Sequence, residues 1–202
     1  MGGALFGRQQ IWVMICGAFC LQYVFWFYIS WLPTYLQKAQ HISITRAGYV
    51  AALPFIAGAV GVLVGGKISD WLVLRGVVPF TARRVVVAVG ALLTAGAMLA
   101  TAFSTDTVTA VSLLTIGMFT YSLTTGCYWA VASDIMQTPR FVASISSIQN
   151  FGGFLGGACA PILTGVLLDH FGGFEAAIIV TSLLALTSAG LYGVMLRRSI
   201  PS

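Results

Sequence analysis

The sequence predicts an all-α membrane protein with six transmembrane helices. Hydrophobic residues make up 58% of the 202 residues and charged residues only 7%, whereas soluble domains carry about 25% charged residues. The apolar residues form long continuous runs that match the ~20 residues a membrane-spanning helix requires. A transmembrane β-barrel would instead show segments of about 10 residues with alternating polarity. Lipid is therefore the predicted solvent for most of this chain.

Short polar breaks divide the apolar sequence into six spans. The predicted spans cover residues 11–36, 47–74, 85–103, 108–135, 141–168 and 174–196, within a bundle of 11–198. The first span is too long for the core of a signal peptide. The segment STDT (104–107) predicts a tight turn before the fourth span, and Glu175 suits the positive end of the sixth helix. Residues 1–10 and 199–202 are predicted to lie outside the bundle.

The basic residues fall almost entirely on one side of this alternating topology. Those on the first side are Arg8, Lys67, Arg75, Arg83, Arg84, Arg140, Arg197 and Arg198. The other side carries only Lys38 and Arg46. Loops rich in Lys and Arg stay on the cytoplasmic side of a membrane, so both termini of this multi-pass protein are predicted to be cytoplasmic. The net charge of +5 then reports membrane orientation, and nucleic acid is not a predicted partner.

The second and fifth spans share a glycine pattern. Each ends with a glycine, three residues and an aspartate, at Gly66 to Asp70 and at Gly165 to Asp169. The topology puts these two ends on opposite faces of the membrane, which predicts a 3+3 inverted repeat. Small residues at this spacing allow helix backbones to approach closely. Static packing and a surface that slides during function are both open interpretations.

A few neutral polar and aromatic residues lie deep in the spans. Gln22 is central in the first span, and Gln149 and Asn150 precede the glycine cluster of the fifth. Because an unpaired amide is costly in hydrocarbon, these side chains should face the bundle interior. They could form interhelical hydrogen bonds or contact polar groups of a substrate. Tyr128 and Trp129 lie deep enough to line a cavity, with simple packing as the alternative.

The sequence offers no pattern for catalysis. Both histidines, His41 and His170, fall in loops, and the four cysteines lie in apolar runs without acidic or histidine neighbours. We therefore predict no enzyme activity, no metal and no cofactor. Ion-coupled transport normally requires a titratable group deep in the membrane, yet no Arg, Lys, Asp or Glu lies at the centre of a span.

Residues 31–76 resemble the seventh and eighth helices of the major facilitator superfamily. The matching segments are WLPTYL, LPFIAG and GGKISDWLVLRG, followed by Arg83 and Arg84, while QNFGGFLGG with Pro161 resembles the eleventh helix. Within the superfamily, these segments resemble the anion:cation symporter family, bacterial carriers of sugar acids and other organic carboxylates. The resemblance extends over essentially the whole chain.

This resemblance implies the C-terminal half of a twelve-helix carrier in a bacterial inner membrane. Residues 1–10 would end the central cytoplasmic loop. Proton-coupled symport of an organic anion by alternating access is the implied activity. In such families the arginines that bind substrate and the acids that couple protons lie largely in the N-terminal half, which would be a missing partner. A truncated fragment that does not transport and a six-helix scaffold or assembly subunit are the alternatives.

The resemblance also implies two groups of functional residues. The substrate contacts would be Gln22, Tyr28, Tyr128, Trp129, Gln149 and Asn150, with Asn150 the closest match. The cytoplasmic gate would comprise Gly66, Asp70, Arg75, Arg83 and Arg84. In this gate Asp70 would cap a helix or pair with a basic residue, and the contact would break and reform as the two halves rock. Trp71 stands where the family often has a basic residue.

Overall fold

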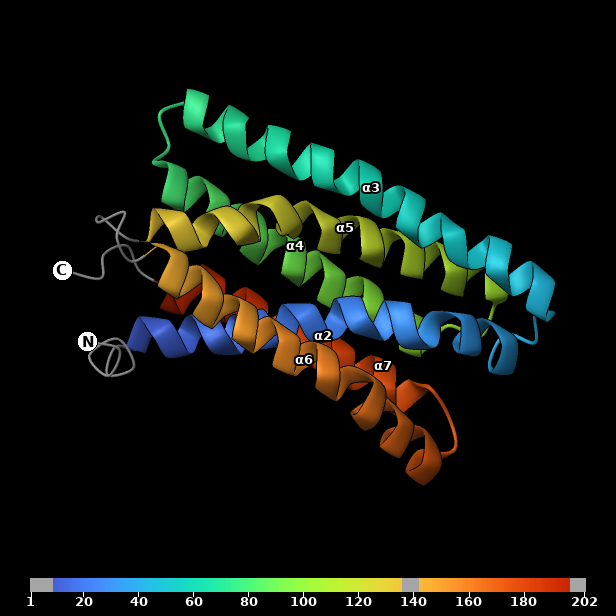
Figure 1. Cartoon of the computed structure of the whole chain (residues 1–202). Coiled ribbons are helices and arrows are strands. Elements are labelled where there is room, and N and C mark those ends of the chain that lie inside the picture. Colours follow the sequence, from blue (N-terminus) through green and yellow to red (C-terminus); the bar gives the residue numbers. More distant parts are fainter. Residues whose placement is uncertain (1–8, 136–141, 197–202) are drawn as a thin grey trace.

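Six long helices form one bundle in the computed structural model, which describes residues 9–135 and 142–196 (Figure 1). The elements are α2 (Gln9–Lys38), α3 (Ile44–Leu74), α4 (Pro79–Ala102), α5 (Thr107–Asp134), α6 (Val142–Phe171), α7 (Glu175–Gly190) and the π-helical turn η2 (Leu191–Met195). Counting α7 with η2, all six are long and apolar enough to cross a membrane. The described residues contain no strand. The predicted all-α class with six spans is confirmed.

Helix boundaries differ most from prediction at α4. This helix begins at Pro79, six residues before the predicted start at 85, because proline is favoured in the first turn of a helix. Arg83 and Arg84 consequently lie within α4 and not in the loop before it. α2 begins at Gln9, so the last two residues of the predicted N-terminal loop are helical. Residues 1–8 and 199–202, together with Arg140, Arg197 and Arg198, lie outside the described residues.

Two parallel helix pairs have close backbone contacts in the bundle. α2 packs along α6, and α3 packs along α5. In each pair, glycines of one helix contact backbone carbonyls of the other: Gly61 with Phe119, Gly65 with Leu123, Gly152 with Ile15, and Gly156 with Phe19. In a 3+3 repeat α2 corresponds to α5, and α3 corresponds to α6. The pair of α2 with α6 is then equivalent to the pair of α5 with α3. The predicted 3+3 repeat is therefore present in the packing, and these glycines serve close packing of backbones.

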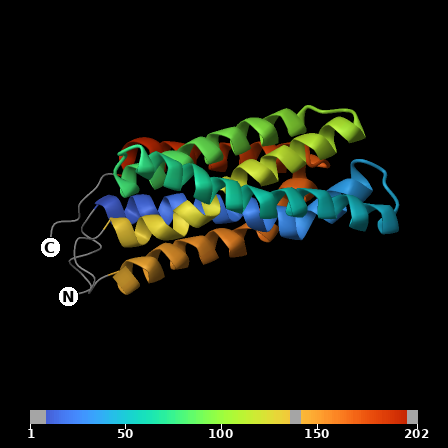
Figure 2. The same ribbon diagram turned by 90° about the horizontal axis from the view of Figure 1, so that it is seen from above.

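The two ends of the bundle differ in charge. Four basic residues gather at the end where α3 leads into α4: Lys67, Arg75, Arg83 and Arg84. Lys38 and Arg46 lie at the opposite end, in the last turn of α2 and the first turn of α3. Figure 2 shows the same elongated bundle from above, with the α3–α4 turn and the α2–α3 turn at opposite ends. The charge asymmetry counted in the sequence is thus an asymmetry in space.

A side-chain cap fixes the start of α5. The Asp106 carboxylate accepts hydrogen bonds from the backbone N–H and the hydroxyl of Thr109, which is the usual role of aspartate before a first helical turn. These bonds hold the pKa of Asp106 below its usual range. The cap sets the point at which α5 enters the bundle, and therefore the depth of its polar residues.

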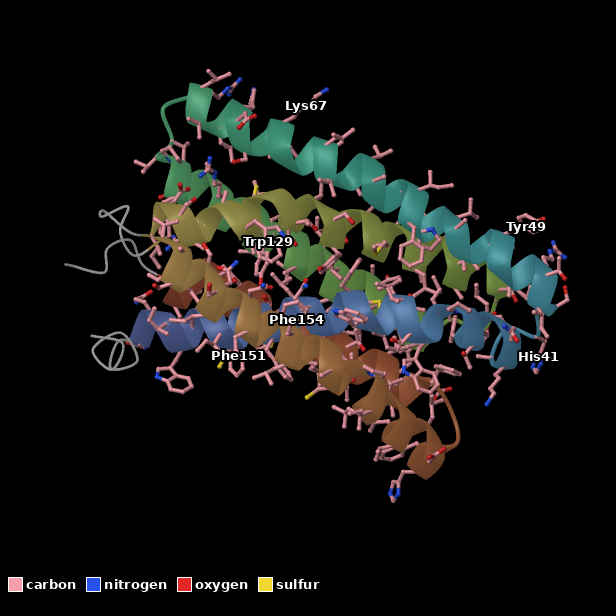
Figure 3. All side chains as sticks on the ribbon, viewed as in Figure 1. His41, Tyr49, Lys67, Trp129, Phe151 and Phe154 are labelled. Atoms are coloured by element: carbon pink, nitrogen blue, oxygen red, sulfur yellow. The ribbon has the colours of Figure 1, made fainter. Side chains whose placement is uncertain are left out.

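The helices differ in how much of their surface the bundle covers. α2 is largely enclosed, while α3 and α6 leave most of their apolar side chains exposed. Figure 3 shows Phe151 and Phe154 projecting from α6 and Trp129 lying on α5. The junction of α2, α5 and α6 therefore lies next to a face that the chain itself does not cover.

Candidate functional site

Polar side chains from three helices converge at the junction of α2, α5 and α6. The Tyr121 hydroxyl donates to Gln22 Oε1 at 2.9 Å. Gln149 Nε2 donates to the backbone carbonyl of Tyr128 at 3.0 Å. Gly153 permits this convergence, because a Cβ there would lie 2.9 Å from Gln22 Cγ and 3.4 Å from the Tyr128 hydroxyl. The structure thus brings together three of the predicted substrate residues, Gln22, Tyr128 and Gln149.

Two polar atoms of this cluster have no hydrogen-bond partner among the described residues. They are Gln149 Oε1 and the Tyr128 hydroxyl oxygen, and both side chains are buried. Leaving a buried polar atom unpaired costs about 1–3 kcal/mol, and hydrocarbon offers no water to relieve that cost. Because native structures pair nearly all such atoms, these two atoms leave hydrogen-bonding capacity that the described residues do not use.

Asn150 and Trp129 lie at the accessible side of the cluster. Asn150 precedes Gly153 by three residues, so both belong to one face of α6. Its side chain is partly exposed. Trp129 is 45% exposed, and its ring meets the Tyr128 ring edge-on at 4.9 Å. Both predicted residues are therefore partly open to the surroundings, and Trp129 is labelled on α5 in Figure 3.

Tyr28 has a different environment. Its side chain is fully buried, and its hydroxyl donates to the backbone carbonyl of Leu114 at 2.9 Å and lies 3.2 Å from Met98 Sδ. Both partners belong to the core formed with α4 and α5. The geometry favours an interhelical hydrogen bond as the role of Tyr28, which is the structural alternative to a substrate contact.

Tyr121 is a member of the cluster that the sequence analysis missed. Its hydroxyl orients Gln22, and its ring stacks on Phe25 at 5.8 Å. The available signal was spacing: Tyr121 precedes Tyr128 by seven residues, which is two helical turns. Gln22 and Phe25 are one turn apart on α2, so they share a face of that helix, as Tyr121 and Tyr128 share a face of α5.

The residues of the predicted gate separate into two groups. Arg75 stacks over the Trp71 ring at 4.1 Å, which gives Trp71 a role where the family often has a basic residue. Asp70 is exposed, with no ion pair among the described residues. A Cβ at Gly66 would have open space around it. Gly66 and Asp70 therefore form an uncovered surface at the basic end of α3.

Arg83 and Arg84 are instead bound within the bundle. Arg83 Nη1 lies 2.6 Å from the Asp134 carboxylate, which joins α4 to the end of α5. Arg84 Nη1 donates to the backbone carbonyl of Leu196 at 2.6 Å, just beyond η2. Asp134 was not singled out from the sequence, because any aspartate at the same end of the bundle could pair with these arginines.

Replacing Arg83 by glutamine should lower the unfolding free energy by about 1–2 kcal/mol, since the lost pair is charged yet partly solvent-screened. The two side chains are 30% and 19% exposed. Thermal unfolding of the purified chain in detergent measures this, with Lys67→Gln as the control at an exposed basic residue. The exchanged double variant Arg83→Asp with Asp134→Arg should recover part of the loss. Equal melting temperatures for R83Q and K67Q would contradict the assignment.

Comparison with known proteins places this arrangement in a family. The sequence pattern of the Major Facilitator Superfamily matches residues 2–158. The chain belongs to this superfamily. The predicted family resemblance is therefore confirmed, and a superfamily of membrane transporters accounts for six apolar helices with a 3+3 repeat.

The relatives of this superfamily member include sugar-acid transporters. The chain is 33% identical to the "Probable L-galactonate transporter" of Escherichia coli over 98% of its length and 43% of that protein. It is 30% identical to the "D-galactonate transporter" of Escherichia coli O6:H1, over 93% of its length and 43% of that protein. The "Hexuronate transporter" of Bacillus subtilis is 30% identical over 83% of the chain and 40% of the relative. The chain thus spans less than half the length of these relatives.

Solved structures show the same fold. A bacterial homologue of the human lysosomal transporter Spinster, in an inward-facing and unoccupied conformation, matches with a TM-score of 0.73 and 17% identity. The match covers 97% of this chain and 50% of that one. The chain therefore has the fold of half a major facilitator transporter, and the relatives named above are transporters.

Proposed function

We propose that the chain is the C-terminal half of a secondary transporter that carries an organic anion, a sugar acid or related carboxylate, by proton-coupled symport and alternating access. The polar cluster of Gln22, Tyr121, Tyr128 and Gln149 is the observation that carries this proposal. It lies deep in an apolar bundle and contains unpaired polar atoms. The names of the sugar-acid relatives support an anion with several hydroxyl groups as substrate.

The charges for substrate binding and proton coupling come from a second six-helix half in this proposal. The cluster residues of the described chain are neutral, and its acidic and basic side chains lie toward the helix ends. Relatives more than twice as long as the matched region provide room for such a half. Substrate then binds between the two halves, with Asn150 and Trp129 facing it from this side.

The proposed gate lies on the cytoplasmic side of a bacterial inner membrane. The basic end of the bundle faces the cytoplasm in this orientation, together with both termini. Gly66 and Asp70 offer the surface for contact with the other half, Arg75 holds the loop, and Arg83 and Arg84 hold α4 against α5 and η2. The gate opens as the halves rock about the fixed binding site.

Uptake by cells tests the proposed function. The chain, expressed together with a matching N-terminal half, should accumulate radiolabelled galactonate, and a protonophore should abolish accumulation. The chain without the second half should give background uptake. If the pair takes up no sugar acid at all, the proposal fails in favour of a non-transporting fragment or a scaffold. Uptake that needs sodium and ignores the protonophore would refute the proton coupling alone.

A further inference from the structure

A third unpartnered polar atom, the hydroxyl of Tyr192, comes from the last helical segment. Tyr192 belongs to η2 and is fully buried. Its hydroxyl has no hydrogen-bond partner among the described residues. The Tyr192 ring packs against Gly17 of α2, where a Cβ would lie 2.5 Å from Cε2. The same ring lies 6.4 Å from that of Tyr128, tilted by 67°.

Tyr192 continues the buried face of α7, because Ser188 and Ala189 are buried and Tyr192 follows them by four and three residues. The π turn begins at Leu191 and changes the direction of the residues after it, and such turns are frequent at functional sites. The Leu196 N–H donates to the Leu191 carbonyl across the turn, and the Arg84 guanidinium donates to the Leu196 carbonyl. Just before the turn, Ser188 Oγ donates to the Gly17 carbonyl. The turn is therefore fixed on both sides, with its tyrosine directed inward.

The orientation of the Gln149 amide determines what this region can bind. Its amide faces the backbone carbonyl of Tyr128 at 3.0 Å. Because a carbonyl only accepts, the NH₂ group must occupy that side, which leaves Oε1 as a pure acceptor. The Tyr128 hydroxyl lies near Gln149, yet no hydrogen bond of normal geometry joins them. One acceptor and two hydroxyls are thus left for a bridging group.

We propose that Gln149, Tyr128 and Tyr192 form a subsite for a hydroxyl group of the substrate, distinct from the place where its carboxylate binds. A hydroxyl donates to Gln149 Oε1 while it accepts from a tyrosine, whereas a carboxylate only accepts and would repel the amide oxygen. The subsite adjoins Gly153 and hence the α6 face of Asn150. This inference rests on the proposed transport function and adds that recognition of hydroxyl groups belongs to this half.

The subsite is tested by removing single hydroxyl groups, first from the tyrosines of the protein and then from the substrate. Tyr192→Phe and Tyr128→Phe, each in the complete two-half transporter, should raise the KM for D-galactonate about tenfold, the worth of one well-formed hydrogen bond, without lowering the maximal rate. Each monodeoxy galactonate lacks one hydroxyl group of galactonate. The wild-type transporter should bind one of these compounds as weakly as the Y192F variant binds galactonate. For that compound, Y192F should cause no further loss.

Two further variants serve as a negative and a positive control for the effect of Y192F on KM. Tyr49→Phe removes an exposed hydroxyl at the far end of α3 and should leave KM unchanged. Gly17→Ala should displace the Tyr192 ring and reproduce the Y192F phenotype. An unchanged KM in Y192F would overturn the proposal. An equal loss of affinity for galactonate and for every deoxy compound would also overturn it, because a bound water, and not a substrate hydroxyl, would then bridge these atoms. Galactonate binding to the purified pair, measured by thermal shift, separates this result from a failure of transport itself.

Discussion

Replacing Gly65 by leucine should leave almost no folded protein, whereas the same change at its neighbour Gly66 should leave the fold intact. A Cβ at Gly65 would meet the backbone of Leu123 on α5, with the Leu123 Cα 2.7 Å away. Backbone cannot move aside as a side chain can, so the cost should exceed the ~1–3 kcal/mol typical of overpacked cores. A Cβ at Gly66 has nothing within 4 Å, and a helix interior gains about 1 kcal/mol when glycine is replaced by a good helix former.

The yield of monodisperse protein from membranes, together with thermal unfolding in detergent, measures both variants. The pair is closely matched, because the two glycines are adjacent in one helix and receive the same side chain. Similar yields for G65L and G66L would show that α3 and α5 can separate without loss of the fold. If the gate assignment is right, G66L should be folded yet transport slowly, since leucine would crowd the surface offered to the other half.

The contrast between these glycines shows what the sequence could and could not predict about packing. Glycines spaced four apart in α3 and α6 predict close helix contacts, and such contacts are found. Their partners carry no signal, because Phe119 and Leu123 contribute backbone carbonyls that any residue would supply. The choice of α5 as the neighbour of α3 therefore required the three-dimensional arrangement, even though the repeat that demands it was visible in the sequence.

The polar cluster was predictable only in part for a related reason. Amides deep in apolar spans are costly, so Gln22 and Gln149 could be recognised by type and depth alone. Tyr192 could not, because a tyrosine near the end of a span is usually an interfacial residue, and its type alone does not indicate burial. Arg83 illustrates a third limit. Two acids, Asp70 and Asp134, lie in the last turns of neighbouring helices at the same end of the bundle, and only the geometry selects Asp134 as the partner of Arg83.

Replacing Asn150 by alanine should reduce galactonate uptake about 10- to 100-fold while leaving folded protein at the wild-type level. The side chain is partly exposed on the α6 face next to Gln22 and Tyr128, and no hydrogen bond within the described residues occupies its amide. An amide that forms up to two bonds with substrate contributes about 1–3 kcal/mol to binding, which corresponds to the expected loss. Initial uptake rates across a range of galactonate concentrations measure it.

Gln22 provides the informative comparison, because its Oε1 already accepts a hydrogen bond from Tyr121. Gln22→Ala leaves a buried hydroxyl unpaired and should therefore lower thermal stability as well as uptake, whereas N150A should lower uptake alone. Ser147→Ala is the matched control, since Ser147 lies one turn earlier on α6, is exposed and donates to the Ala143 carbonyl of its own helix. Unchanged uptake in N150A would remove Asn150 from the site. Lost stability in N150A would instead assign it to helix packing, so the two measurements together separate binding from structure at this position.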